Sequence, residues 1–317
     1  MKIIHVGLGK TGTTFLQNEI FPKVAKILNI EFIDSKNFEK KYNHHSGNEI
    51  GTFHPFHTKK KAIKKFHYDD YFLSYETLCG HECNPLFWKK SAKINQKIFG
   101  KNATVLLTVA DPLDFFSSLY CGMYHAYIIK NEKDFFLTHI QSQKYFKNKK
   151  DKHFVDYEIY DIAKLINIYK NLFNKVIVLK KKDIKNMKIL SELFENNDIQ
   201  KIKFKKVYYN RSYSKFSMKL TYIAENFLKL FNSSLYNFFN LSVRKIPNIN
   251  INNKLFNIIN RKILYRLRYE LRWRYFIQFR LDRIIPYKKF YVNKNNLKKI
   301  KLVNHKKFYE NLKSSII

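Results

Sequence analysis

Short apolar runs alternate along this chain with longer segments in which apolar residues recur at helical spacing. The first run, residues 3–6, predicts a parallel strand buried on both faces, and helical spacing resumes at Phe15 directly after a glycine-rich turn. Further strands are predicted at 30–33, 71–76, 103–109 and 175–179, and helices at 13–29, 86–99, 112–130, 133–146, 157–173 and 185–195. This alternation predicts an α/β fold with a central parallel sheet flanked by helices.

The pattern changes at about Tyr213, after which longer helical segments are predicted and no strands. Arginines and aromatic residues interleave over 260–283, with Leu264, Leu267 and Leu271 as an apolar stripe at helical spacing. We therefore expect an α/β domain over residues 1–212 and a basic, aromatic-rich helical extension over 213–317. The extension is expected to pack on the core, with attachment to an anionic membrane or glycolipid surface as the alternative.

Composition limits the class of protein without choosing a partner. The 317 residues include 60 Lys and Arg against 25 Asp and Glu, which gives a formal net charge of +35. Such a field attracts polyanions and anionic surfaces and is screened over about 8 Å at physiological salt. The same Lys-, Asn- and aromatic-rich bias runs through the whole chain, so the charge alone does not identify a ligand. No nucleic-acid-binding module is recognisable, and no nucleic acid partner is expected.

The cellular compartment is predicted from cysteine usage and from the absence of targeting patterns. Three cysteines are odd in number and sparse, which favours a reducing compartment over a disulfide framework. No signal peptide precedes the first strand, and no apolar run reaches the length of about 18 residues that a membrane span needs. We expect a cytoplasmic protein, with peripheral attachment at the inner membrane face if the extension binds lipid.

Candidate chemistry is concentrated in the turn after the first strand, Gly7-Leu-Gly-Lys10-Thr-Gly-Thr-Thr14. Backbone N–H groups at a helix start point outward, and the helix dipole favours an anion there. Gly7, Gly9 and Gly12 would let the backbone approach phosphate oxygens without side chains in the way. The turn predicts a phosphate-binding loop, and the alternative is an ordinary strand-to-helix connection.

The glycine spacing is that of a nucleotide-hydrolase P-loop, but Thr13 stands where that motif needs its lysine. The segment Lys10-Thr11-Gly12-Thr13-Thr14 instead resembles the 5′-phosphosulfate loop of sulfotransferases that use 3′-phosphoadenosine 5′-phosphosulfate (PAPS), typically Lys-Ser-Gly-Thr-Thr. The resemblance covers roughly the first two-thirds of the chain. It implies a P-loop-like three-layer fold with PAPS as co-substrate, Lys10 on the bridging oxygen, and Thr11, Gly12, Thr13 and Thr14 around the 5′-phosphate and sulfuryl oxygens. A sulfuryl group carries less charge than a γ-phosphoryl group, so no metal is expected.

The second part of the resemblance lies after the strand at 103–109. The family typically has Arg-Asp-Pro there, with a serine eight residues after the arginine, and both contact the 3′-phosphate. Ser118 matches the serine, but Ala110 replaces the arginine. Loss of a charge-assisted hydrogen bond worth about 1.5–3 kcal/mol implies binding about one to two decades weaker. Otherwise another base substitutes: Arg211, or the lysines at 180–182, which alternatively form a solvated charge run.

A candidate general base follows the strand that begins at Tyr71. Ser74-Tyr75-Glu76 resembles the Ser-x-Glu that closes a core strand in bacterial and heparan-type sulfotransferases, which implies that Glu76 accepts the proton of an acceptor hydroxyl. The alternative is an acid in the first turn of a helix, which the helix dipole favours. Five histidines compete for the role of base: His44, His45, His54, His57 and His67.

A zinc site at Cys79-Gly-His-Glu-Cys83 is not expected, because a second pair of ligands at usable spacing is missing. The resemblance therefore implies a PAPS-dependent carbohydrate sulfotransferase that transfers a sulfuryl group to a hydroxyl of a glycan or lipid-linked sugar. One alternative is another P-loop kinase or nucleotide hydrolase, with 105–111 as a metal-binding strand. The other is a degenerate, non-catalytic sulfotransferase fold that binds a polyanionic surface.

Overall fold

The computed structural model describes residues 1–35, 37–38, 69–80, 87–126, 132–147, 155–156, 161–204, 214–220, 222–223, 287–293 and 302–316. The chain divides into two compact units. The first unit comprises Met1–Phe116, Glu132–Asn210 and Asn293–Ile317, and the second unit comprises Ser117–Asn131 and Arg211–Val292.

The first unit is built on a six-stranded sheet with the order β2-β3-β1-β4-β7-β8. The strands are β1 Lys2–His5, β2 Glu31–Asp34, β3 Tyr71–Ser74, β4 Thr104–Val109, β7 Lys175–Lys180 and β8 Ser315–Ile316. All neighbours pair in parallel except β7 and β8, which are antiparallel. The predicted α/β fold with a central parallel sheet is therefore confirmed. The strands read as continuous apolar runs because β3 is buried along its whole length, and β4 and β7 are buried after their first residue.

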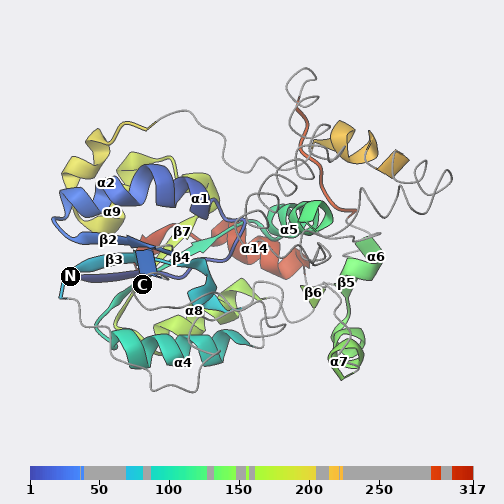
Figure 1. Ribbon diagram of the computed structural model, residues 1–317, viewed down its shortest axis with the longest axis horizontal. Helices are drawn as coiled ribbons and strands as arrows, with labels where there is room; N and C mark the ends of the chain where they lie inside the picture. The colour runs from blue at the N-terminus through green and yellow to red at the C-terminus, as the bar shows by residue number, and fades with distance from the viewer. Residues whose placement is uncertain are drawn as a thin grey trace, which may run out of the picture. The chain divides into compact units, whose positions relative to one another are not determined.

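Helices cover both faces of this sheet (Figure 1). One face carries α1 Thr13–Phe15, the π-helical turn η1 Leu16–Ile20, α2 Phe21–Ile27, α9 Met187–Phe194 and the 3-10 helix η5 Asn197–Lys201. The other carries α4 Trp88–Phe99 and α8 Ile162–Lys170. The apolar residues of the first group, Phe21 and Leu190 among them, form one buried cluster with Phe72, Leu106 and Ile177 of the strands. This burial holds the start of α1 against the sheet.

Capping side chains decide where several of these helices begin. The Asp161 carboxylate accepts the Lys164 N–H at 3.1 Å and starts α8, so the helix expected over 157–173 begins only at Ile162. The Asn186 side chain accepts the Ile189 N–H at 3.2 Å and starts α9 in the same way.

The single helix expected over 133–146 is wrong, since the segment holds α6 Glu132–Phe135, the strand β5 Phe136–Leu137 and α7 His139–Lys147. β5 pairs in parallel with β6 Val155–Asp156 in a separate two-stranded sheet. Thr138 causes the break. Its hydroxyl accepts the Gln141 N–H at 3.3 Å and the Gln141 side chain accepts the Thr138 N–H at 3.0 Å, a capping box that restarts the helix.

The end of the chain differs from the strand-free extension expected over 213–317. The helix α14 Leu302–Asn311 and the strand β8 belong to the first unit, and β8 extends the sheet beyond β7. Lys180 holds these last residues (302–316, the C-terminal tail) in place, because its ammonium donates to the carbonyls of Tyr309 at 2.5 Å and Leu312 at 2.6 Å. The ammonium also lies 4.3 Å from the centre of the Tyr309 ring. Burial is the main cause of a lowered pKa for Lys180.

The second unit contains the later part of α5 Pro112–Ala126 and the segments around Ser214 and Val292. Within it the Tyr120 and Tyr222 hydroxyls are 2.7 Å apart, and the Val292 N–H donates to Ser117 Oγ at 3.1 Å. The arginine- and aromatic-rich segment 260–283 lies outside the described residues.

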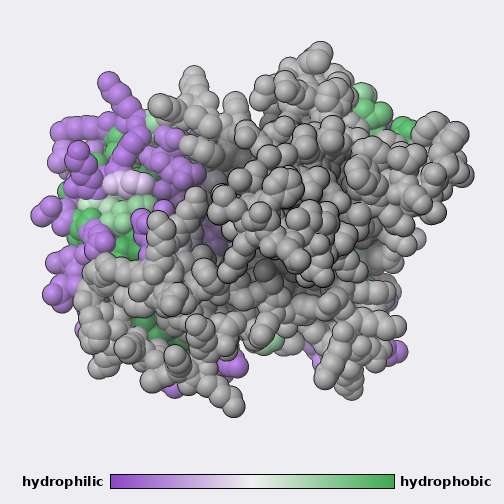
Figure 2. Space-filling model, viewed as in Figure 1, coloured by the Kyte–Doolittle hydropathy of each residue, from purple (hydrophilic) through white to green (hydrophobic). Residues whose placement is uncertain are grey.

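Figure 2 shows that the described surface around the amino ends of the parallel strands, at the left of the view, is mostly hydrophilic. Among the described residues, no helix is both long enough and apolar enough to cross a membrane.

Candidate functional site

The carboxyl ends of the parallel strands meet at one edge of the sheet, and the strand order reverses there. From β1 the chain builds β2 and β3 on one side and then crosses to β4 and β7 on the other. Ligands of open α/β sheets bind outside the carboxyl ends of the strands at such a switch point. The segments that leave the sheet here include the β1–α1 loop (residues 6–12), the start of α5 after β4, and the 3-10 helix η4 Lys181–Asp183 after β7.

The β1–α1 loop turns with two residues in the left-handed region, Lys10 at φ 64° and Gly12 at φ 93°. Lys10 is exposed. The Gly12 carbonyl accepts the N–H groups of Phe15 at 3.1 Å and Leu16 at 3.2 Å, which starts the helix. Gly9 and Lys10 form a hydrogen-bonded turn between Leu8 and Thr11, whereas the N–H groups of Gly12 and Thr13 donate to no residue that the structure describes. A lysine at positive φ is a strained choice, and such strain gathers at functional turns.

The threonines of this loop do not all face outward. The buried Thr11 hydroxyl donates to the Leu8 carbonyl at 2.5 Å and lies 2.7 Å from the Thr108 hydroxyl on β4. Thr13 is also buried, whereas Thr14 is half-buried. The Thr11 side chain therefore fastens the loop to the sheet and does not face outward.

A buried polar network lies beneath the loop. His5 on β1 is fully buried, with Nδ1 2.7 Å from Ser74 Oγ on β3 and Nε2 3.2 Å from Thr108 Oγ1 on β4. Gln17, in the π-helical turn, donates to the same Ser74 hydroxyl at 3.1 Å. Through Thr108 the network continues to Thr11, so three neighbouring strands and the loop share one chain of hydrogen bonds. Burial lowers the pKa of His5 to about 3, and the imidazole is neutral at physiological pH.

We expect His5 to make the protein sensitive to mild acid. The pKa is 6.5 in an unfolded chain and about 3 in the folded state. Between pH 6.5 and pH 3, the imidazole of His5 is therefore protonated in the unfolded state and neutral in the folded state. The free energy of unfolding should fall by about 1.4 kcal/mol per pH unit, or about 2 kcal/mol between pH 7 and pH 5. Urea denaturation of the wild type and of His5→Gln at several pH values measures this effect, because the contributions of the other titrating groups cancel when the two free energies of unfolding are subtracted. The prediction is contradicted if the free energies of unfolding of the two proteins change with pH in parallel.

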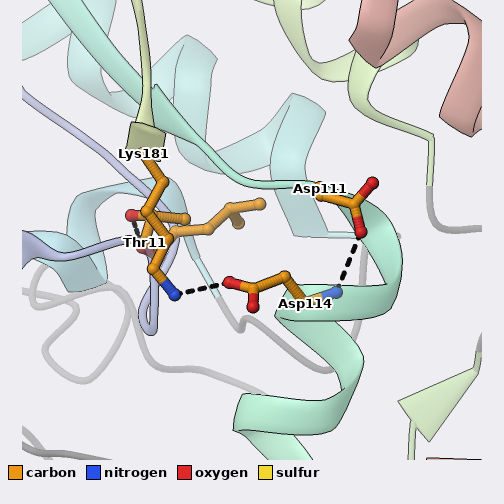
Figure 3. A network of polar contacts seen from close by, with 5 residues as sticks. Thr11, Asp111, Asp114 and Lys181 are labelled. Atoms are coloured by element: carbon orange, nitrogen blue, oxygen red, sulfur yellow. Dashed lines mark hydrogen bonds and ion pairs between the residues drawn. The ribbon is translucent and has the colours of Figure 1, made fainter. Parts of the chain in front are cut away.

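Lys181 and Asp114 form an ion pair beside the loop (Figure 3). Lys181 Nζ lies 2.7 Å from Asp114 Oδ2, and the two side chains are 29% and 21% exposed. Asp111 Oδ1 accepts the Asp114 N–H at 3.0 Å, which confirms the predicted Asp111 cap at the start of α5. A Cβ added to Gly12 would stand 3.9 Å from Lys181 Cγ, so the lysine stem lies against the loop. Burial, followed by the Lys10 charge, lowers the pKa of Lys181 to about 8.

Among the substitutes considered for the missing arginine, the three lysines have different surroundings. Lys180 is buried and bonded to carbonyls of the tail, Lys182 is exposed, and Lys181 lies against the loop. Arg211 lies outside the described residues. Ala110 is fully buried at the end of β4, so an arginine there would carry its side chain into packed surroundings. Ser118 is buried on α5, in the second unit, one helical turn after Asp114.

Glu76 leaves the sheet next to the β1–α1 loop. Ser74 pairs in register with His5, and the Tyr75 N–H donates to the His5 carbonyl at 3.2 Å. The predicted strand to Glu76 is two residues too long, because β3 ends at Ser74 and Glu76 opens the 3-10 helix η2 Glu76–Cys79. Glu76 is half-buried there. Its carboxylate thus occupies a helix start at the same sheet edge as Lys10.

Several other candidates lie outside the described residues: His44, His45, His54, His57, His67 and Cys83. Cys79 is buried and belongs to no disulfide. In the described part of the chain, no group of three or more His, Cys, Asp or Glu side chains is arranged to hold a metal ion.

Sequence reasoning missed the polar network and the ion pair. His5 and Thr108 are each a buried polar residue next to apolar residues of a strand, and such buried groups need partners. That signal was available in the sequence. Asp114 and Lys181 are 67 residues apart, and no local pattern links them.

Comparisons of this chain with protein-family models, with curated proteins and with solved structures found no match.

Proposed function

We propose that this chain is a PAPS-dependent sulfotransferase whose β1–α1 loop serves as the P-loop-like 5′-phosphosulfate loop. One observation carries the proposal. The Lys-Thr-Gly-Thr-Thr segment turns at the carboxyl end of the central strand β1, with Lys10 exposed and with the N–H groups of Gly12 and Thr13 donating to no described residue. Amide groups at a helix start and one exposed ammonium, placed at a switch point of the sheet, suit a bound sulfated nucleotide.

The proposed reaction is an in-line displacement at sulfur. An acceptor hydroxyl oxygen forms a bond to sulfur while the bond from sulfur to the bridging phosphate oxygen breaks. Glu76 takes the hydroxyl proton, and adenosine 3′,5′-bisphosphate leaves. Lys10 stabilises the negative charge that develops on the bridging oxygen, and Thr11, Gly12, Thr13 and Thr14 hold the 5′-phosphate and sulfuryl oxygens.

The remaining parts of the proposal come from the resemblance. Ser118 would hold the 3′-phosphate, with Arg211 as a further candidate in the segment after residue 204. The acceptor would be a hydroxyl of a glycan or lipid-linked sugar. The basic and aromatic residues of segment 260–283, rather than the resemblance, suggest either packing on the core or attachment to an anionic surface at the cytoplasmic face of the inner membrane. No metal takes part in this scheme.

A second candidate function is a non-catalytic scaffold of the same fold. The observation that favours it is Ala110, which is fully buried where the family has a phosphate-binding arginine. Without that guanidinium, cofactor affinity would fall by about one to two decades. A third candidate, a metal-dependent kinase or nucleotide hydrolase, is disfavoured by Thr13 at the position of the P-loop lysine.

Calorimetry with adenosine 3′,5′-bisphosphate separates the three candidates. A sulfotransferase should bind it with the same affinity in the presence and absence of a metal chelator. No binding at about 1 mM, which means less than about 4 kcal/mol of binding free energy, favours the scaffold. Tighter binding of ATP with magnesium than of the bisphosphate would contradict the sulfotransferase and favour the kinase class.

A further inference from the structure

We propose that Lys181 is a second cation of the anion site at the β1–α1 loop, and that Asp114 holds its ammonium until an anion displaces the carboxylate. This inference rests on the proposed function, because it assumes that the loop binds an anion. It adds a binding residue and a switchable ion pair that the resemblance does not assign.

The fold gives Lys181 a fixed place at the site. The preceding residue, Lys180, is held by the carbonyls of Tyr309 and Leu312, and its backbone is extended at φ −75° and ψ 140°. Successive side chains of an extended chain point to opposite sides, so anchoring Lys180 on the tail turns Lys181 the other way. There its stem lies near Gly12, with the Ile184 side chain on the same side of the loop. Lys181 therefore reaches the anion site from β7, on the side of β4 away from β1.

The charges explain why a carboxylate accompanies this lysine. Without an anion, Lys10 and Lys181 place two positive charges at one loop, and the Lys10 charge adds to burial, the larger cause, in lowering the pKa of Lys181. Asp114 offsets that repulsion. Once a phosphate or sulfate group occupies the loop, Asp114 becomes a like charge beside it, whereas Lys181 gains a second acceptor. The anion and Asp114 thus compete for one ammonium.

The arrangement also accounts for the buried Ala110. Where the resemblance implies an arginine after β4, this chain places a small residue inside the packed end of the strand. A cation from the neighbouring strand β7 supplies positive charge at the same edge of the sheet. The proposed anion site therefore lacks the arginine but keeps a positive charge, which Lys181 supplies.

Three variants test the competition by calorimetry with two probes, adenosine 3′,5′-bisphosphate and inorganic pyrophosphate. Lys181→Met should weaken binding by about 10- to 100-fold, the loss expected for one charge-assisted hydrogen bond. Asp114→Asn should tighten binding by about 3- to 10-fold, because it removes the competing carboxylate and keeps the shape. Lys182→Met is the matched control, since it removes the same charge from the exposed neighbouring position, and should change affinity by less than about twofold.

A pH series gives a second readout. In the wild type, affinity should fall as the pH rises from 7 to 9.5, because Lys181 loses its proton above its pKa of about 8. Lys181→Arg should bind with little loss over the same range, since a guanidinium keeps its charge. Melting temperatures of all variants show whether each is folded.

The outcomes distinguish this inference from the proposed function. Weaker binding in Asp114→Asn would overturn the competition, and unchanged binding of the bisphosphate in Lys181→Met would overturn the inference while the sulfotransferase proposal stands. If the wild type binds pyrophosphate but not the bisphosphate, and Lys181→Met weakens that binding, the result would support the inference and count against the sulfotransferase proposal. If the wild type binds neither probe, both proposals fail.

Discussion

Gly7→Ala is expected to destabilise the first unit by at least about 3 kcal/mol, the upper range for overpacking a core, because the new methyl group has no room. A Cβ at Gly7 would stand 1.8 Å from Thr108 Oγ1 and 2.7 Å from His5 Nε2. Both atoms belong to the buried network that ties the β1–α1 loop to the sheet. The methyl group would therefore separate Thr108 from His5 and leave buried polar atoms without partners. Urea denaturation measures the loss.

Gly100→Ala is a suitable control for this variant. Gly100 adopts φ +81° and ψ 159°, a region that essentially only glycine occupies, and no atom lies within 4 Å of an added Cβ, so backbone strain of about 1–3 kcal/mol without a steric clash is expected. The double variant Gly7→Ala, Thr108→Ala should recover part of the loss, because it removes the atom that the methyl group strikes. A Gly7→Ala protein as stable as Gly100→Ala, or a double variant with purely additive losses, would show that the network is not packed as described.

Lys10→Met is expected to lower the rate of sulfuryl transfer by about 10²- to 10³-fold, the usual cost of removing one donor to a developing charge. The methionine keeps the length of the side chain and loses the ammonium that the proposed mechanism places on the bridging oxygen. Stability should change little, since Lys10 is exposed. The measurement is release of adenosine 3′,5′-bisphosphate from PAPS in the presence of a panel of glycan acceptors, together with PAPS binding by calorimetry.

The matched control is Lys89→Met, at an exposed position on α4. It removes one positive charge from the molecule and should leave the rate within about twofold of the wild type. Lys10→Arg should recover little activity, because a planar guanidinium does not reproduce the compact charge of an ammonium. Full activity in Lys10→Met would refute the assignment of the β1–α1 loop as the sulfuryl-binding element.

The sequence predicted the central sheet well because parallel strands buried on both faces leave an unmistakable pattern. The strands beginning near Ile3, Tyr71, Thr104 and Lys175 were all placed correctly, and so was the helix start after Asp111. Errors arose where a short element interrupts a longer pattern. The strand β5 is only two residues long, and the prediction of one helix over 133–146 overlooked the capping box at Thr138.

The site was predictable only where its residues are consecutive. The β1–α1 loop was predicted to bind phosphate because glycines, a lysine and threonines follow one another between a strand and a helix. The contacts of individual side chains within the loop could not be predicted from the sequence. Thr11 was predicted to hold phosphate and sulfuryl oxygens, and the sequence did not indicate that its hydroxyl bonds Leu8 and Thr108 inside the fold.

By itself, the sequence determined the α/β class, the parallel strands and the glycine- and threonine-rich turn after the first strand, since each depends on residues close together in the chain. Only the tertiary structure decided which lysine of 180–182 lies against the loop, that Asp114 pairs with it, and that the last residues add a strand to the sheet. The physical reason is that these contacts join residues from about 67 to more than 130 positions apart. Periodicity and capping act within a few turns of chain, whereas packing against a shared sheet brings distant charges together.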